Sequence, residues 1–454
     1  MSGENRENPR KSEAPSTANP AFEIGQALNG DAFGPGGVLL LARGRTIRTQ
    51  AQLERLRQEG IGSSMPCGFS SDRCVISGNT ALGADVRCRL EDEFSGPLLH
   101  APDVEQEPVA PEIPYAEEIV TAQAVRRRTL EQVGRVVSAL QRNEPVDFGD
   151  IRSTAQSVLD SLQRNERALL SLLQLQTRDA YTFTHSVNCC VLSIIIAQRV
   201  GLSNRVLPIS VGALLHDIGK MHLPSSIIRK SDILTPKEWD RIYRHPALGV
   251  EIVRRLGGGD SRFCSLEGIA HHHERLDGSG YPRNLNGDSI ALEGRIVAVA
   301  DVYDAMTSDR TYREAISAPS AAQWIHENAG VLFDPACVDA LIDSVGVFPI
   351  GSLVRLNTGA FAIVVKGNRH RPLRPIILVV SDEAEQPLAD PELLDLAETA
   401  DTASKTSIVS LEDASAIGID IEILLSSVDE ENLLHLEIDR QATAVAPVHL
   451  DALA

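Results

Sequence analysis

The sequence predicts a multidomain, mainly α-helical protein: an all-α domain flanked by a small N-terminal α+β module and a short C-terminal β segment. Three observations lead to this fold class. The chain has 454 residues, too many for a single hydrophobic core. Apolar residues recur at helical spacing through most of residues 115–345. After Val345 the spacing falls to two, as in strands.

Composition and charge limit the class of protein. The chain is 43% hydrophobic and 23% charged, which is ordinary for a soluble globular protein. A formal net charge of −19 argues against a general nucleic-acid binder, which needs a basic surface. The longest apolar run, Cys189–Ala197, is far short of the roughly 18 residues of a membrane span. Seven cysteines without a signal peptide indicate reduced thiols and a cytoplasmic protein.

The N-terminal third is expected to contain one small module. Residues 1–18 are polar, and we expect them to be disordered. In residues 19–66, GGVLLLARG predicts a short buried strand and TIRTQAQLERLRQEGI a helix that ends at Gly60. Residues 67–114 show little periodicity and are interpreted as a linker. The linker contains Cys67, Cys74 and Cys88. Their spacing matches no zinc pattern, so a metal or redox role is the minor alternative.

Helix signals dominate the middle of the chain. Residues 115–167 are interpreted as a helical segment that leads into a domain spanning residues 168–345. Apolar residues between Ile119 and Leu140 keep helical spacing until Glu144-Pro145 interrupts it, and a second helix is expected over Ile151 to Leu162. Farther on, SDILTPKE has the character of a helix start, with Thr235 as the N-cap before Pro236.

The C-terminal part is expected to begin with strands. In residues 346–381, SLVRLNTG, AFAIVVKG and PIILVVSD predict three short strands. Residues 382–454 are rich in Asp and Glu and predict an acidic tail, either poorly ordered or partly helical, for instance around Pro391 to Ala397. Ile417 to Leu425 is apolar enough to dock onto another part of the protein.

Histidine and aspartate punctuate the middle domain in a repeated pattern. They occur in YTFTHSVN, LLHDIGK, YRHPALG, AHHHERLDGSGYP and VAVADVYDAMTS. Imidazoles and carboxylates are ligands of divalent metals, and a buried histidine costs free energy unless something satisfies it. A metal site is therefore the first hypothesis.

Each element of the pattern also has a structural alternative. Lys220 lies four residues after His216, on the same helical face and about one turn away, with Asp217 adjacent to His216, yet a core histidine bonded to a neighbour is the commoner case. His185 could equally be a satisfied core residue, and His245, before Pro246, a surface loop residue.

The histidine run and the last aspartate are more informative. Three successive histidines diverge by about 100° each on a helix, so only two can converge, at a helix end such as the one DGSG provides. The alternative is a solvated tract. Asp301 lies in an almost wholly apolar helix and needs a cation there, either a metal or an arginine such as Arg310.

Together, HDIGK, HHERLDGSGYP and DVYDAMTSDRTYR resemble the HD-GYP family of the HD phosphohydrolase superfamily over about residues 168–345. The resemblance implies a bacterial phosphodiesterase that hydrolyses cyclic di-GMP to linear pGpG, with further cleavage to GMP left open, by attack of a hydroxide that bridges two metals. It implies the metal ligands His185, His216, Asp217, His245, His272, His273 and Asp301. Asp217 would bridge the metals, and His271 has no counterpart.

The resemblance also implies a metal count and roles for other residues. Three-metal members carry a glutamate one turn before the first histidine, where this chain has Tyr181, so we expect two divalent ions, iron or manganese. Lys220 would stabilise the charge that develops on phosphorus. The residues expected to contact the nucleotide are Gly280, Tyr281, Arg310 and Arg313.

Partners follow from the same resemblance. The family binds cyclic di-GMP and uses the GYP turn to contact diguanylate cyclases with GGDEF domains. Long helices before Ala168 would suit a homodimer. The flanks, LLLARGRTIRTQAQLERLRQEGI and FPIGSLVRLNTGAFAIVV, resemble segments of one HD-GYP subgroup and are interpreted as sensory or packing elements. Two alternatives remain: a catalytically weak cyclic di-GMP receptor or scaffold that signals through protein partners, and a phosphohydrolase of another nucleotide.

Overall fold

The computed structural model describes most of residues 113–436. The described residues are 32–33, 39–41, 113–142, 144–173, 181–228, 230, 234–256, 260, 262–308, 315–368, 371–398, 406–412, 414–417, 419–428, 432–433 and 436, without the side chains of residues 32–33, 39–41, 181–182 and 415–416. The predicted N-terminal disorder, most of the α+β module, nearly all of the linker with Cys67, Cys74 and Cys88, and the end of the acidic tail lie outside them.

Two short strands are described in the N-terminal module. β1 (Ala32–Phe33) pairs antiparallel with β2 (Leu39–Leu41), and β2 falls inside the strand predicted from GGVLLLARG.

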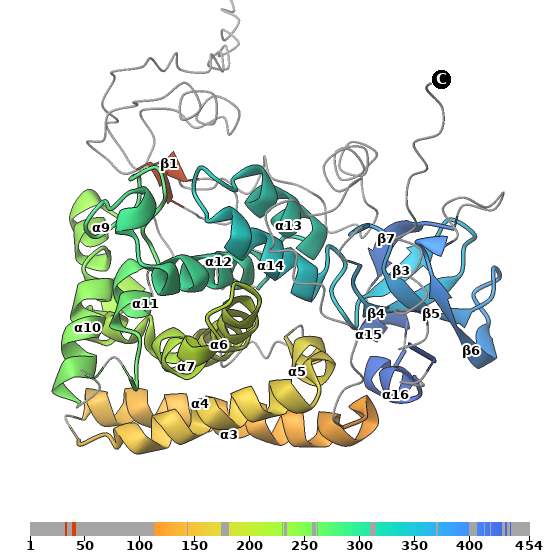
Figure 1. The fold of residues 1–454 in the computed structure, drawn as a ribbon, viewed down its shortest axis with the longest axis horizontal. Coiled ribbons are helices and arrows are strands. Elements are labelled where there is room, and N and C mark those ends of the chain that lie inside the picture. The colour runs from red at the N-terminus through yellow and green to blue at the C-terminus, as the bar shows by residue number, and fades with distance from the viewer. Residues whose placement is uncertain are drawn as a thin grey trace, which may run out of the picture.

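Two antiparallel helices form one edge of the helical region (Figure 1). α3 (Tyr115–Gln141) and α4 (Phe148–Arg164) confirm the two helices expected there, and α5 (Glu166–Leu172) follows. Glu118 of α3 is buried, and it accepts hydrogen bonds from Arg164 at 2.7 Å and Ser161 at 2.6 Å on α4. Because a buried carboxylate needs such partners, this contact fixes the two helices against each other.

The helical domain is built around three apolar helices. α6 (Tyr181–Arg199), α7 (Val206–Leu215) and α12 (Leu292–Thr307) are buried almost throughout, and α12 packs against α6. Around them lie α8 (Ser225–Ile228), α9 (Pro236–Ile242), α10 (His245–Arg255), α11 (Leu266–His271), α13 (Ala318–Glu327), α14 (Pro335–Val345) and the 3-10 turns η3 (Ser203–Arg205), η4 (Ile218–His222) and η5 (Gly287–Ser289).

The predicted start of α9 is confirmed in detail. Thr235 is the N-cap, its hydroxyl accepts from the Glu238 backbone, and the Glu238 side chain accepts from the Thr235 backbone, which is a complete capping box. Pro236 occupies the first helical position, where its missing N–H costs nothing.

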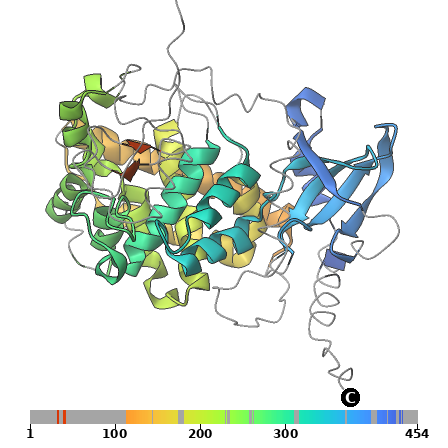
Figure 2. The ribbon, with the colours of Figure 1, turned by 90° about the horizontal axis from the view of Figure 1, so that it is seen from above.

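The C-terminal β segment is a five-stranded antiparallel sheet beside the helices (Figure 2). β3 (Leu353–Leu356), β4 (Phe361–Lys366) and β5 (Ile376–Ser381) confirm the three predicted strands. β6 (Pro387–Asp395) and β7 (Ile408–Glu412) extend the sheet beyond residue 381, in the order β6-β5-β4-β3-β7.

The expectation of a helix around Pro391 to Ala397 is therefore wrong, and part of the predicted acidic tail belongs to the sheet. β6 is an edge strand with most of its side chains at least partly exposed. An edge strand tolerates proline and acidic residues, so it lacks the apolar alternation by which a strand is recognised in sequence.

The apolar stretch near Ile417 to Leu425 does dock. It forms α15 (Ala414–Ile417) and α16 (Ile421–Ser426), and Leu425 is fully buried. Glu422 of α16 accepts a 2.7 Å hydrogen bond from Gln123 of α3, which joins the C-terminal unit to the first helix of the helical region. Within the described ranges, no helix combines the length and apolarity that crossing a membrane requires.

Candidate metal centre

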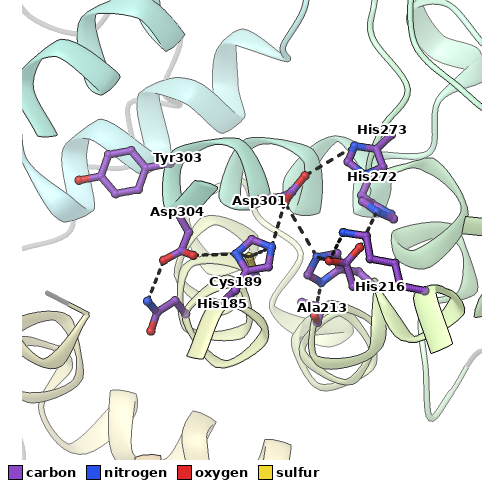
Figure 3. Close-up of polar contacts among 12 residues, drawn as sticks. His185, Cys189, Ala213, His216, His272, His273, Asp301, Tyr303 and Asp304 are labelled. Carbon is purple, nitrogen blue, oxygen red and sulfur yellow. Dashed lines mark hydrogen bonds and ion pairs between the residues drawn. The ribbon is translucent and has the colours of Figure 1, made fainter. Parts of the chain in front are cut away.

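Five elements of the helical domain bring all seven predicted ligands together. α6, α7, α10, α11 and α12, or the residues that directly follow them, supply these side chains. They form two groups, and within each group the ligand atoms lie within 4.8 Å of one another. The first is His185, His216 and Asp301 together with Cys189, and the second is Asp217, His245, His272 and His273. Figure 3 shows Asp301 between the labelled histidines His185, His216 and His273.

Three of the histidines are held in one tautomer by the backbone. In each, Nδ1 lies 2.7–2.8 Å from the carbonyl oxygen three residues earlier: His216 faces Ala213, His245 faces Ile242, and His272 faces Ile269. A carbonyl oxygen can only accept, so Nδ1 carries the proton and Nε2 presents a lone pair to the site. This is the arrangement by which proteins orient imidazole ligands.

Several of the ligand atoms that carry these lone pairs lie close to one another. The Nε2 atoms of His245 and His272 are 3.2 Å apart, and His245 Nε2 is also 3.2 Å from Asp217 Oδ1. Burial lowers the pKa of His216 and His245 to about 4, so both are neutral at pH 7 and their Nε2 atoms carry no proton. His216 Nε2 and Asp217 Oδ1 are buried without a hydrogen-bond partner among the described residues. These converging imidazole nitrogens and carboxylate oxygens suit a divalent cation.

Both aspartates stay ionised in this buried site. Burial by itself would raise the pKa of Asp217, but the charge of Lys220, whose Nζ lies 2.5 Å from Oδ2, holds it well below its ordinary value. Burial acts the same way on Asp301, but a hydrogen bond from His185 at 3.1 Å and the positive charge of that imidazole, whose own pKa is raised, keep the pKa of Asp301 well below the usual range. Two buried carboxylates thus add negative charge to the lone pairs, which favours cation binding.

The sequence analysis missed a group of residues behind His185. His185 Nδ1 donates to Asp304 Oδ2 at 2.7 Å, and Asn188 donates to Asp304 Oδ1 at 2.7 Å. Burial pushes the pKa of His185 down, but its interactions with Cys189, Asp301 and Asp304 hold it well above the ordinary value. Asp304 therefore orients the ring, as a carboxylate does behind a metal-binding imidazole. Its position, one turn after Asp301 in the same apolar helix, is the signal that could have identified it.

Cys189 lies beside His185 without the character of a thiolate ligand. Its Sγ is 3.6 Å from His185 Nδ1, and burial raises its pKa to about 12, so it is a neutral thiol at pH 7. All four cysteines among the described residues are free.

The GYP turn supports the histidine pair from the other side. A Cβ on Gly280 would lie 2.4 Å from the His273 carbonyl oxygen and 2.5 Å from the Arg275 nitrogen, so only glycine fits there. The Tyr281 ring stacks on His273 with centroids 4.5 Å apart and contacts Tyr243 at the same distance. This packing fixes His273, which at 18% side-chain exposure is the most accessible of the seven.

Comparison with known proteins places the chain in a family. A family profile described as an HD domain matches residues 169–337. The cyclic di-GMP phosphodiesterase PA4108 of Pseudomonas aeruginosa is 34% identical over 304 residues, covering 66% of this chain and 71% of the relative. The chain belongs to the HD-GYP family of cyclic di-GMP phosphodiesterases. A second profile, a KOW domain associated with the HD domain, matches residues 353–406, which contain most of the C-terminal sheet.

Other relatives match a smaller share of the chain. The cyclic di-GMP phosphodiesterase response regulator RpfG of Xanthomonas campestris is 40% identical over 189 residues, covering 40% of this chain and 49% of the relative. The 3'3'-cGAMP-specific phosphodiesterase 3 of Vibrio cholerae is 36% identical over 174 residues, or 38% of this chain and 37% of the relative. The chain thus spans about half or less of the length of these two.

The HD-GYP motif HDIGK does not lie on one continuous helix. α7 ends at Leu215, and the chain continues as the 3-10 turn η4. Only glycine fits at Gly219 in this turn, because a Cβ there would overlap the His245 carbonyl oxygen. The expected helical face shared by His216 and Lys220 is therefore wrong. Lys220 instead contacts Asp217, and about a third of its side chain is exposed.

The remaining predicted site residues are placed as follows. His271 lies outside both groups of ligand atoms, and its Nδ1 accepts from the Ala291 backbone at 3.4 Å. Tyr181 begins α6, but its side chain lies outside the described residues, as do Arg310 and Arg313 entirely. The assignments that depend on those side chains stay predictions.

Proposed function

We propose that this chain is a metal-dependent phosphodiesterase that hydrolyses cyclic di-GMP to linear pGpG. The observation that carries the proposal is the convergence of unprotonated His216, His245 and His272 nitrogens on two buried, ionised aspartates. The names of PA4108 and RpfG as cyclic di-GMP phosphodiesterases support the substrate.

Two divalent ions, iron or manganese, are the proposed cofactors. Each of the two ligand groups combines imidazole nitrogen with carboxylate oxygen, which suits either metal, and the neutral Cys189 thiol adds no soft ligand. When bound, such ions activate a water molecule and neutralise charge on the phosphate. The proposed ligands are His185, His216, Asp217, His245, His272, His273 and Asp301.

Asp217 is suited to serve both groups. Its Oδ1 faces His245 of the second group at 3.2 Å, while its Oδ2 lies 3.6 Å from His216 of the first. A carboxylate with one oxygen toward each group is the shared ligand that a binuclear site needs. Asp217 also keeps the Lys220 ammonium beside the metal site, where it can stabilise the charge that develops on the phosphate oxygens.

We assign nucleotide binding to Gly280, Tyr281, Arg310 and Arg313. The protein's own rings His273 and Tyr243 contact Tyr281, so we propose that it acts mainly by holding His273 beside the bound phosphate. The fixed fork of an arginine suits phosphate oxygens, which supports the roles of Arg310 and Arg313. A cyclic GMP–AMP substrate is the second candidate, since one relative is named for it.

Three broader assignments belong to the same proposal. Contact with GGDEF-domain diguanylate cyclases would use the GYP turn. A homodimer would form through the helices before Ala168. One of these helices, α3, carries the apolar residue Val120, which is 66% exposed. The location would be cytoplasmic.

Hydrolysis tests the proposal directly. Full-length protein is reconstituted with Mn²⁺ or Fe²⁺ under reducing conditions, given cyclic di-GMP or cyclic GMP–AMP, and followed by chromatography. We expect linear pGpG from the wild type, none after chelation, and none from Asp217→Ala. Asp260→Ala is the matched control, because Asp260 pairs with Arg262 at the surface away from both ligand groups. Equal product from Asp217→Ala would overturn the proposal, and nucleotide binding without product would favour the receptor alternative.

A further inference from the structure

A cavity of about 720 Å³ lies where the helical domain meets the C-terminal sheet. Its walls come from α3, α5, α12, β3, β7 and the segment from α15 to α16. This volume is in the range that holds a drug-sized molecule. The cavity is separate from the two groups of ligand atoms, but Asp304 belongs to its wall.

The lining is largely apolar and its charges have one sign. Apolar side chains include Ile119, Leu170, Leu192, Ile350 and Leu425. The charged residues that line it are Asp304, Glu412, Asp420 and Glu422. Among the described residues, no lysine, arginine or histidine lines the cavity.

These carboxylates differ in how far their charge is balanced. Glu412 is paired with Arg355 at 3.1 Å, and Asp304 is bonded to His185. Among the residues that the structure describes, Asp420 accepts only from backbone N–H groups at the start of α16, and Glu422 accepts from the uncharged amide of Gln123. Two arginines also lie near the wall, since Arg167 lies over the Tyr115 ring at 5.3 Å and Arg126 interacts with Asp304. The uncompensated negative charge is therefore at Asp420 and Glu422, and that end of the cavity favours a cation.

Tyr303 presents an unpaired polar group to this cavity. Its side chain is 6% exposed, and the residue lines the cavity. Figure 3 shows its ring directed away from Asp301 and the labelled histidines. In the described part of the chain no hydrogen-bond partner meets its hydroxyl, which lies at the cavity wall. A ligand with a polar group would give this hydroxyl a partner.

We propose that this cavity binds a largely apolar organic cation, with a polar group of the ligand meeting the Tyr303 hydroxyl. The apolar walls would bury the body of the ligand, and Asp420 and Glu422 would balance its charge. A cyclic dinucleotide is excluded as the occupant by its negative charge, so this is a second ligand and a second site.

Consecutive residues of α12 connect this cavity with the metal centre. Asp301 belongs to the first ligand group, Tyr303 faces the cavity, and Asp304 both lines the cavity and holds His185 at 2.7 Å. A ligand that shifts this turn of α12 changes the orientation of a metal-binding imidazole. Metal and cation are therefore expected to alter each other's affinity by the same factor. This coupling rests on the proposed metal centre, whereas the binding itself does not.

Binding is tested with three probes that share one apolar body. Full-length protein is titrated by calorimetry with (1-naphthylmethyl)trimethylammonium, 1-naphthylmethanol and 1-naphthalenesulfonate. We expect saturable binding of one cation per chain, weaker binding of the alcohol and none of the sulfonate. Equal binding of the cation and the sulfonate, or no binding of the cation, would overturn the proposal.

Two tryptophan variants on the same short helix localise the site. Ala414 lines the cavity, whereas Ile417 of α15 is 40% exposed and is absent from the lining. We expect Ala414→Trp to fill the cavity and weaken the cation at least tenfold, and Ile417→Trp to leave it unchanged. Equal effects of the two variants would place the probe elsewhere.

The coupling is measured without substrate. The affinity for the cation is compared in metal-free and Mn²⁺-loaded protein, and we expect it to differ by about fivefold or more. Equal affinities would overturn the coupling. Because neither measurement uses hydrolysis, an inactive protein that still binds the cation would contradict the proposed phosphodiesterase function alone.

Discussion

The helical domain and the C-terminal sheet both have apolar interiors, but they bury different polar groups. The sheet region buries mainly hydroxyl and amide side chains, such as Ser352, Asn368 and Ser381. The helical domain buries imidazoles and carboxylates next to one another, including His216, Asp217 and Asp301. Burying charge is costly unless it is balanced, and a folded chain gains no stability from placing two carboxylates among histidine lone pairs. The difference indicates that the helical interior is arranged for chemistry and the sheet interior for stability.

The largest expected effect follows from removing charge at the shared ligand. Asp217→Asn is expected to lower the rate of cyclic di-GMP hydrolysis by about 10³-fold or more, because the second ligand group loses its carboxylate charge and the proposed bridge to the first group is removed. The matched change in the sheet is Asp395→Asn, where a buried carboxylate accepts from the Ala397 backbone. We expect near-normal rates from that variant. Similar losses in both variants would remove the functional distinction between the regions.

Truncating a buried apolar side chain in the sheet is expected to lower stability and to leave metal binding unchanged. Ile363 lies in the central strand β4 and is fully buried, so Ile363→Ala should lower the free energy of unfolding by about 2–5 kcal/mol. Chemical denaturation measures the loss, and calorimetric titration with Mn²⁺ is expected to show an unchanged affinity. A large drop in metal affinity would mean that the sheet shapes the metal centre.

An intermediate effect is expected from the residue that orients His185. Asp304→Asn keeps the size of the side chain but weakens its hold on the His185 Nδ1 proton, which should lower Mn²⁺ affinity by about 10–100-fold. Cys189→Ala is the control, since its neutral thiol is next to the same ring. The orienting role would be refuted if Asp304→Asn bound Mn²⁺ as tightly as the control.

The smallest expected effect lies at the N-terminus of α9, where no proposed ligand is located. Thr235→Ala removes the side-chain cap of α9 and should cost about 0.5–2 kcal/mol of stability with little change in hydrolysis. Thermal unfolding would show the loss. Stability equal to the wild type would mean that water replaces the cap without cost.

Patterns strong within a short stretch of sequence predicted the fold best. α3, α4, the cap at Thr235 and strands β3 to β5 each carry a local signal of periodicity or capping. β6 and β7 were missed because edge strands carry little apolar alternation, and their pairing is decided by the sheet. The close approach of Gly219 to the His245 carbonyl was missed because it joins segments that are separated along the chain.

At the metal site, too, local motifs were predicted and features that depend on distant parts of the chain were not. Seven residues were proposed from motifs, and the structure gathers them into two groups. The sequence did not indicate the tautomers of His216, His245 and His272, since these depend on backbone carbonyls at helix ends. It also did not indicate the cavity, which forms only where α3, α12 and the C-terminal elements meet.

A metal titration tests the central claim most directly. Metal-free protein receives Mn²⁺ in steps, and the rate of linear pGpG formation from cyclic di-GMP is measured at each step. We predict that the rate rises until two equivalents per chain are present and then levels off. No product at any ratio, or a plateau at one or at three equivalents, would contradict a hydrolytic centre with two metals at these residues.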